Sequence, residues 1–349
     1  MNKHPITKTV LGLVKDLTPR NRDIVSRRFG LKTGKKETLE SIGKSYGITR
    51  ERVRQIEEST LGQLVKTSQN NQDLAKYVNL ATDIIKTSGG VVKESDLFNE
   101  FSGSINDNVA NASLAFVLRL NNQLVRTSEN DDFDAFWALD KEHTESFNNT
   151  VVSLVGLMKQ NKNVLSEKDF YNFAQKGGVT GIAGQPLSEK QVGLCLNISK
   201  SLDKNIYNEI GLATWPEIKP GGVKDKAYLV LKKDKSPKHF SEIANLINAT
   251  GFSGKKANVQ TVHNELIKDG RFVLIGRGIY ALSEWGYKPG TVRDVLVDIL
   301  KKSSRPLQKY AILTKVMDAR LVKENTVLLN LQDSKTFTKN KDGTYTLKA

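Results

Sequence analysis

The sequence predicts a mainly α protein with small β wings, of the α+β class, in which an N-terminal helix-turn-helix precedes tandem winged-helix domains. Three observations predict this class. Helix-start and helix-stop residues divide the first 66 residues into short helices. From residue 73 onward, a pattern of helices closing on a β-rich phrase recurs four times. The 349 residues are 38% hydrophobic, which suits several modest cores better than one large core.

The first predicted helix begins at Thr18 and Pro19. Threonine caps free backbone amides and proline suits the first helical position. Gly30 is the predicted stop of this helix, and a basic loop over 32–36 follows it.

Two further helices are predicted after this loop. Thr38 is expected to cap a short helix, and Gly47 supplies the tight turn that follows it. Thr49 then caps a longer helix, which we expect to run to about Leu64. A polar linker is expected from Lys66 onward.

The last of these helices has two different faces. One stripe at helical spacing is largely apolar and consists of Val53, Ile56, Thr60 and Leu64. The other face carries arginine, glutamine and glutamate, which suit guanine, adenine and cytosine edges respectively. The candidate base-reading residues are Arg50, Glu51, Arg54 and Gln55. The alternative is an ordinary solvated helix face.

The segment 17–64 resembles region 4 of bacterial primary-type sigma factors. The phrases LTPRNRDIVSRRFGL and GITRERVRQIEE carry this resemblance through their order and separation. The resemblance implies that the last helix docks in the major groove of a promoter minus-35 element, where Arg50, Glu51 and Gln55 face bases and Arg54 supports them. It also implies contact with the flap of the RNA polymerase β subunit.

The resemblance further implies contacts to the DNA backbone. The residues expected there are Arg20, Arg28, Thr38 and Leu39, and we add Arg52 from the flank of the last helix. No aromatic and basic helix resembles the region that melts a minus-10 element, so the sequence does not predict a factor that starts transcription alone.

The rest of the chain repeats with a spacing of about 60–75 residues. The predicted opening helices lie at 74–90, 146–162, 224–237 and 291–306. Second helices follow at 94–101, 166–174, 239–249 and 307–319. The closing phrases are FWALD (136–140), LATWPEI (212–218), IYALSEW (279–285) and TYTL (344–347). A third helix precedes each β-rich end, which is the winged-helix arrangement.

The sequence therefore predicts five domains. They are the helix-turn-helix at 1–66, an acidic winged helix at 72–142, a second winged helix at 144–220, a third at 223–288 and a basic fourth at 290–349. The stretch VTGIAGQP (179–186) interrupts the pattern of the second copy.

The third copy resembles the HARE-type winged helix, the fold also seen in the δ subunit of bacterial RNA polymerase. The phrase DGRFVLIGRGIYALSEW, with its upstream helix, carries this resemblance. Possible DNA contacts in this copy are Lys255, Lys256, Arg271 and Arg277. His263 is interpreted as a packing or solvated histidine, and the aromatic residues Phe272, Tyr280 and Trp285 as core.

Charge is distributed unevenly along the chain. The net charge is +15, and it divides into +8 for residues 1–66, −6 for 67–143, +1 for 144–222 and +12 for 223–349. Basic ends around an acidic to neutral middle favour nucleic-acid contact at the ends.

Several classes are excluded on sequence grounds. A single cysteine and four scattered histidines give neither a disulfide framework nor a zinc-site spacing. No apolar run approaches the about 18–20 residues that span a bilayer, and no secretory signal is seen. No phosphate loop or catalytic motif stands in a suitable context, and the acidic run ENDDFD (129–134) is interpreted as a solvated wing loop.

We therefore expect a DNA-binding transcription factor or regulator that acts with RNA polymerase on promoter-like double-stranded DNA. It is expected to be a cytoplasmic, nucleoid-associated protein and not an enzyme, with no cofactor, metal, membrane or small-molecule substrate. The alternative is a structural nucleoid or adaptor protein that binds DNA non-specifically and bridges to other proteins.

Overall fold

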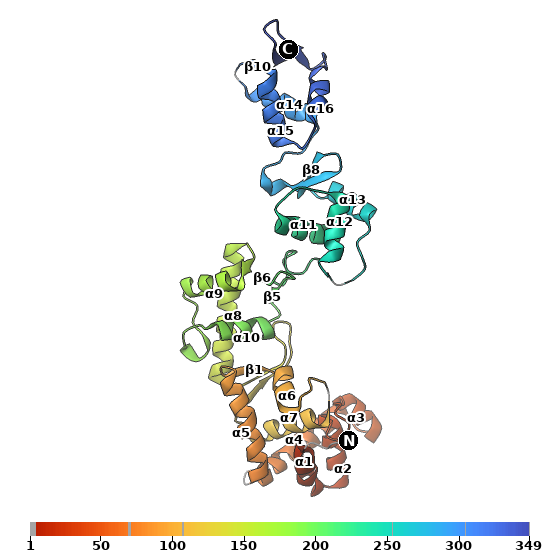
Figure 1. The fold of residues 1–349 in the computed structure, drawn as a ribbon. Coiled ribbons are helices and arrows are strands. Elements are labelled where there is room, and N and C mark those ends of the chain that lie inside the picture. Colours follow the sequence, from red (N-terminus) through yellow and green to blue (C-terminus); the bar gives the residue numbers. More distant parts are fainter. Residues whose placement is uncertain (1–4, 69–70, 107, 253, 304, 349) are drawn as a thin grey trace. The chain divides into compact units, whose positions relative to one another are not determined.

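The computed structural model describes residues 5–68, 71–106, 108–252, 254–303 and 305–348 (Figure 1). Short α-helices alternate with four three-stranded antiparallel sheets, which confirms the α+β class. The chain forms two compact units, residues 1–213 and 214–349, and each is described by itself.

The helix-turn-helix at the start of the first unit has the helix ends predicted at Thr18, Gly30, Thr38 and Gly47, and it is preceded by a helix that the sequence analysis did not predict. Its helices are α1 (Pro5–Lys15), α2 (Pro19–Phe29), α3 (Leu39–Tyr46) and α4 (Arg50–Ser68). Thr18 and Thr38 cap α2 and α3 by accepting hydrogen bonds from backbone amides, and Gly30 ends α2 with a φ of 72°. The sequence signals for these helix ends are confirmed.

Helix α4 is longer than expected. It continues to Ser68, so the segment predicted as a polar linker from Lys66 begins inside the helix. Leu64 is buried and Val65 packs against the same core, which stabilises the extra turn. Residues 69 and 70 of the predicted linker lie outside the described residues.

Four winged helices follow, and each has three helices and three short strands. The first contains α5 (Gln72–Thr87), β1 (Val91–Lys93), α6 (Glu94–Ser102), α7 (Val109–Asn121), β2 (Val125–Thr127) and β3 (Phe136–Ala138). The second contains α8 (Lys141–Asn161), β4 (Leu165–Ser166), α9 (Glu167–Lys176), α10 (Glu189–Ile198), β5 (Leu202–Lys204) and β6 (Glu209–Leu212).

The second unit contains the other two winged helices. The third consists of α11 (Val223–Asp234), β7 (Lys238–His239), α12 (Phe240–Ala249), α13 (Val259–Lys268), β8 (Phe272–Gly276) and β9 (Ile279–Leu282). The fourth consists of α14 (Val292–Lys302), β10 (Leu307–Gln308), α15 (Lys309–Ala319), α16 (Glu324–Leu331), β11 (Phe337–Lys339) and β12 (Thr344–Leu347). In each of the four sheets the last strand lies between the other two, so the repeat predicted from the sequence is a repeat of the same strand order.

The stretch 179–186 that interrupts the second copy forms a small loop between α9 and α10. It contains a single 3-10 turn, η1 (Ile182–Gly184), which packs against α8. The isolated bridge between Thr180 and Pro186 closes this loop. The insertion therefore leaves the three helices of the winged helix in place.

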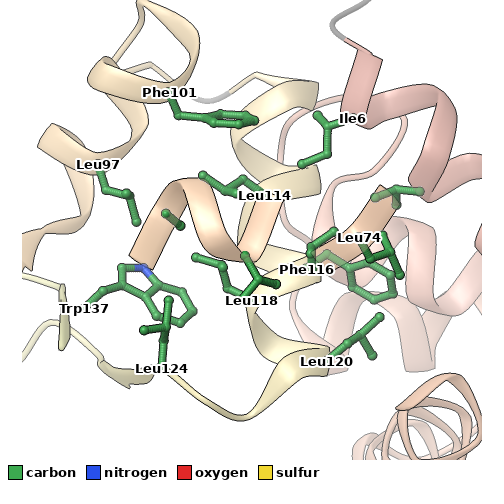
Figure 2. Packing of buried hydrophobic residues seen from close by; sticks show 14 of the residues in the cluster. Ile6, Leu74, Leu97, Phe101, Leu114, Phe116, Leu118, Leu120, Leu124 and Trp137 are labelled. Atoms are coloured by element: carbon green, nitrogen blue, oxygen red, sulfur yellow. The ribbon is translucent and has the colours of Figure 1, made fainter. Parts of the chain in front are cut away.

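The helix-turn-helix and the first winged helix share one hydrophobic core (Figure 2). This core runs from Ile6 of α1 through α2 and α4 to Trp137 of β3, and α7 lies at its centre. Phe116 of α7 is fully buried and meets Phe29 of α2 edge-on, with ring centroids 5.0 Å apart. The predicted boundary at residues 66–72 thus falls inside a shared core, and the five domain boundaries stay predictions.

Within the described ranges, none of the helices has the length and apolar character needed to cross a bilayer.

Candidate nucleic-acid interface

The helix-turn-helix is built on a small core beneath α3 and α4. Ile24, Ile42 and Val53 are fully buried there, one from each of α2, α3 and α4. Close packing of the turn requires a glycine, because a Cβ on Gly43 would stand 2.7 Å from the carbonyl oxygen of Ile48. This core fixes the angle at which α4 projects.

The two faces of α4 are as the sequence predicted. Val53, Thr60 and Leu64 are buried, and Ile56 is half-buried. The candidate base-reading residues Arg50, Glu51, Arg54 and Gln55 are all exposed near the N-terminus of the helix, as is Arg52. The structure thus brings these five side chains together on one solvent-facing surface, which we call the α4 polar face.

Side chains on the α4 polar face pair with one another. Arg54 donates to Glu51 at 2.8 Å and also contacts Glu58, while Arg52 donates to the Gln55 side-chain oxygen at 3.0 Å. The hydrogen bond to Arg54 lowers the pKa of Glu51, and the pKa of Arg54 is correspondingly raised. Water screens exposed pairs of this kind, so these side chains can exchange their partners for a ligand at small cost.

The residues expected at a DNA backbone lie in different settings. Arg20 is exposed, and its guanidinium stands 5.6 Å from the centre of the Tyr46 ring. Thr38 caps the exposed N-terminus of α3, where Leu39 is half-buried against the small core. Arg28 is held internally, since it donates to the Glu57 carboxylate at 3.2 Å and to the Glu37 carbonyl at 3.1 Å.

The third helix of the first winged helix is buried in a domain joint. Helix α7 contacts α1, α2 and α4, and Leu114, Phe116 and Leu118 are 1% exposed or less. A winged helix that inserts its third helix into a groove must leave that helix open. The face of α7 is instead covered by the helix-turn-helix.

The second and fourth winged helices are joined to their neighbours in related ways. Helix α10, the third helix of its domain, packs on β1, and Lys93 donates to the Asn197 carbonyl across the joint. In the second unit, the segment between α15 and α16 lies along β8, where the Leu321 amide donates to the Ile275 carbonyl. Arg320 is 3% exposed and donates to backbone carbonyls of the third winged helix, including that of Leu274. Sequence reasoning missed all three joints.

One signal in the sequence marks the α7 joint. The helix reads VANASLAFVLRLN, which is apolar around most of its circumference. A helix of that composition is expected to be buried on all sides, whereas a groove-binding helix has a polar face. The other two joints have no comparable signal in the local sequence, because they consist of a few backbone and side-chain contacts between separate domains.

Helix α13 of the third winged helix keeps an open face within its unit. Val259 is 40% exposed and Ile267 is 63% exposed on this helix. Lys255 and Lys256 are exposed in the preceding loop, and Arg277 is exposed in the turn between β8 and β9. Arg271 is held internally, because its guanidinium donates to Asp225 at 2.8 Å and to Asp269 at 2.6 Å.

The aromatic residues of the third winged helix are core residues, as predicted. Phe272 and Tyr280 are buried, and Trp285 packs against the same cluster. His263 was expected to be a packing or solvated histidine, and it takes the packing setting, stacked on Phe240 with ring centroids 4.3 Å apart.

The thiol of the single cysteine has low reactivity in the folded protein. Cys195 is fully buried in α10, and burial raises the pKa of its thiol to about 12. Across the parts of the chain that the structure describes, no group of three or more metal-ligating side chains is found.

Comparison with known proteins extends these observations. Residues 13–66 match the family described as sigma-70, region 4. The RNA polymerase sigma factor SigA1 of Synechococcus elongatus is 39% identical over 76 residues, which cover 22% of this chain and 19% of that protein. SigA of Clostridium acetobutylicum is 39% identical over 67 residues, covering 19% of this chain and 18% of that protein.

A plant relative matches over a similar length. The chloroplastic RNA polymerase sigma factor sigF of Arabidopsis thaliana is 38% identical over 80 residues, which cover 23% of this chain and 14% of that protein. The chain thus spans about a fifth or less of the length of these relatives. The comparisons confirm the predicted resemblance of the first helices to sigma region 4, and the HARE-type resemblance of the third winged helix stays a prediction.

Proposed function

We propose that this protein is a DNA-binding transcription regulator whose region 4-type module reads promoter-like DNA in association with RNA polymerase. The α4 polar face carries the proposal. It presents arginine, glutamate and glutamine at the start of a helix projected by a rigid helix-turn-helix core, and these residue types read base edges in a major groove.

Within this proposal, Arg50, Glu51 and Gln55 read bases and Arg54 positions Glu51 through their mutual hydrogen bonds. Backbone phosphates are proposed to meet Arg20, Arg28 and Arg52 and the N-terminus of α3 at Thr38 and Leu39. Free amides at a helix N-terminus favour an anion, and Arg28 is already oriented by Glu57.

Contact with the β-subunit flap of the polymerase is part of the same proposal. Because α7 covers the apolar side of α1, α2 and α4, the flap would have to use a different surface of the module or displace α7. A stable complex with intact α7 packing would therefore place the polymerase on the exposed sides of the helix-turn-helix.

Helix α13 is the second surface that we propose for DNA. Lys255 and Lys256 precede its N-terminus and Arg277 lies in the adjacent wing turn, so all three are free to meet phosphates. Arg271, held by two aspartates, is proposed to orient the wing base and to contact DNA only where a phosphate replaces one of them. The proposed role needs no catalytic chemistry. We place the protein in the cytoplasm, bound to DNA.

Selection of bound sequences from a random double-stranded DNA pool tests the proposal. The full chain is compared with Gln55→Ala at near-physiological salt. We expect the full chain to enrich one sequence element, and the variant to lose base preference at one position of it, since a lost base contact reduces the binding free energy by about 1–3 kcal/mol. Arg20→Ala is the matched control, and it should weaken binding evenly across sequences. Equal and sequence-independent losses in both variants would refute base reading.

A second candidate function is a structural or adaptor protein that binds DNA through phosphates and bridges other proteins. The burial of α7 and α10 in domain joints favours it, because these winged helices then act as spacers rather than readers. Measurable binding with no enriched sequence would support this function over the first.

A further inference from the structure

A pocket of about 410 Å³ lies at the seam between the helix-turn-helix and the first winged helix. The helix-turn-helix contributes Arg28, Lys36 and Glu57 to its lining, and the first winged helix contributes Arg119, Arg126 and Ser128. The pocket is therefore composite, since each domain supplies about half of its polar groups.

Two of the four cations at this pocket are neutralised by carboxylates. Arg28 pairs with Glu57 at 3.2 Å, and Arg126 pairs with Glu94 through a hydrogen bond of 2.8 Å. Lys36 and Arg119 are exposed, and among the described residues no carboxylate lies within 4.0 Å of either. Lys36 lies near enough to Glu94 to help lower the pKa of that carboxyl, but the four cations outnumber the two carboxylates paired with them, so the site is net positive although the first winged helix is acidic overall.

The shared core fixes the backbone segments that carry these two cations relative to one another. Phe29 and Phe116 meet edge-on across the seam, and Gly34 in the loop next to Lys36 lies so close to α7 that a Cβ would stand 2.7 Å from the Asn108 Cα. Trp137 further anchors Glu94, to which its indole donates at 3.0 Å. An anion that bridges Lys36 and Arg119 would therefore need to order only their side chains and not the two segments that carry them.

The pocket also borders the proposed phosphate path. Lys36 stands two residues before Thr38, the cap of the α3 N-terminus, and Arg28 belongs to both sets of residues. A DNA backbone that follows the α3 N-terminus would pass this cationic pair. Serine at position 128 adds an exposed hydroxyl donor at the rim.

We propose that Lys36 and Arg119 form a composite phosphate site, which holds DNA backbone beyond the edge of the sequence read by α4. The acidic first winged helix thereby contributes directly to DNA binding, through a side chain of α7 and not through insertion of that helix. This inference rests on the proposed function of the helix-turn-helix.

Salt-dependent DNA binding tests the site. Affinity of the full chain is measured over a range of salt for wild type, Lys36→Ala, Arg119→Ala and Arg119→Lys, with Lys86→Ala as the control for an exposed cation outside the pocket. One duplex carries the enriched element extended on both sides, and a second duplex is trimmed to the element. Unchanged urea midpoints show that the variants fold.

On the extended duplex, each alanine variant should lower the magnitude of the log–log salt slope by about 0.9, the value for one lost phosphate contact. Arg119→Lys should restore the slope, and the trimmed duplex should show no difference. Slopes equal to those of wild type and Lys86→Ala on the extended duplex would overturn the site and leave the proposed function intact. Failure of the wild-type chain to bind either duplex would instead refute the proposed function, and the site with it.

Discussion

Replacement of Phe116 by alanine tests whether the helix-turn-helix and the first winged helix form one cooperative structure. Phe116 belongs to α7 in the first winged helix, yet its ring packs against Phe29 in α2. The two rings are parts of the single core that also includes α1 and α4. Loss of the Phe116 ring should therefore destabilise helices on both sides of the seam.

The size of the effect follows from burial. An aromatic side chain buries about 150–250 Å², which at about 25 cal/mol per Å² corresponds to about 4–6 kcal/mol. Alanine keeps one methyl group, and measured phenylalanine-to-alanine changes in cores cost about 3–5 kcal/mol. Because Phe116 is fully buried, we expect a loss in this range. That is a large fraction of the total stability of a typical domain, about 5–15 kcal/mol.

Native-state hydrogen exchange at increasing urea measures where the loss appears. The slowest amides of α2–α4 and those of α5–α7 should lose the same opening free energy in Phe116→Ala. Phe337→Ala is the control, because Phe337 is 3% exposed in the separate core of the fourth winged helix. It should leave the exchange of α2–α4 unchanged.

A specific result would refute the shared-core reasoning. If α5–α7 lose protection in Phe116→Ala while α2–α4 keep it, the two domains fold independently and their seam adds little stability. DNA binding gives a second readout, since destabilising the seam should weaken binding by the α4 polar face only if the domains are coupled.

Three further predictions concern single sites. Gly43→Ala should lower the free energy of unfolding by about 1–3 kcal/mol and weaken DNA binding, because the added Cβ would meet the Ile48 carbonyl oxygen. The control is Gly62→Ala, whose added Cβ has no neighbour within 4 Å, and it should lower neither stability in urea nor DNA affinity. Burial opposes ionisation of Glu94, but its hydrogen bonds to arginine outweigh this and lower its pKa below the ordinary 4.5. Its contribution to stability is present above that value and lost as pH falls through the lowered pKa, so Glu94→Gln should reduce stability at neutral pH and flatten the acid limb of a pH–urea profile. Cys195, whose pKa is raised to about 12, should resist alkylation at about pH 8 in the native protein and react fully in urea; rapid native labelling would contradict its burial.

The parts of the fold that were predicted from sequence depend on local interactions. Thr18, Gly30, Thr38 and Gly47 mark helix ends because each satisfies or permits backbone geometry within a few residues of its own position. The exposure of Gln55 also depends on local sequence, because it follows from the helical period of α4. Such signals are sufficient to place the α4 polar face without knowledge of the rest of the chain.

The parts that were missed depend on partners far apart in the sequence. The acidic run at 129–134 is an exposed wing loop between β2 and β3, as expected, but the sequence did not show that Glu129 also pairs with Lys200 of the second winged helix at 2.7 Å. The sequence likewise does not show that Arg28 is paired with Glu57, almost thirty residues away. Charge counted along a sequence does not reveal which charges neutralise each other.

The joints also change what a repeated winged helix implies about function. Four copies of one topology suggest four equivalent binding modules, but α7 and α10 are covered by neighbouring domains and α16 is short and carries a single charged residue, Glu324. Among the third helices, α13 combines an open face within its unit with two exposed lysines before its N-terminus, whereas α16 is preceded by the single lysine Lys323. If one winged helix enters a groove, the physical requirements of charge and access select the third copy. The second copy lies between the shared core and α13 in the chain, so deleting this copy should alter the spacing of bound elements and leave their sequences unchanged.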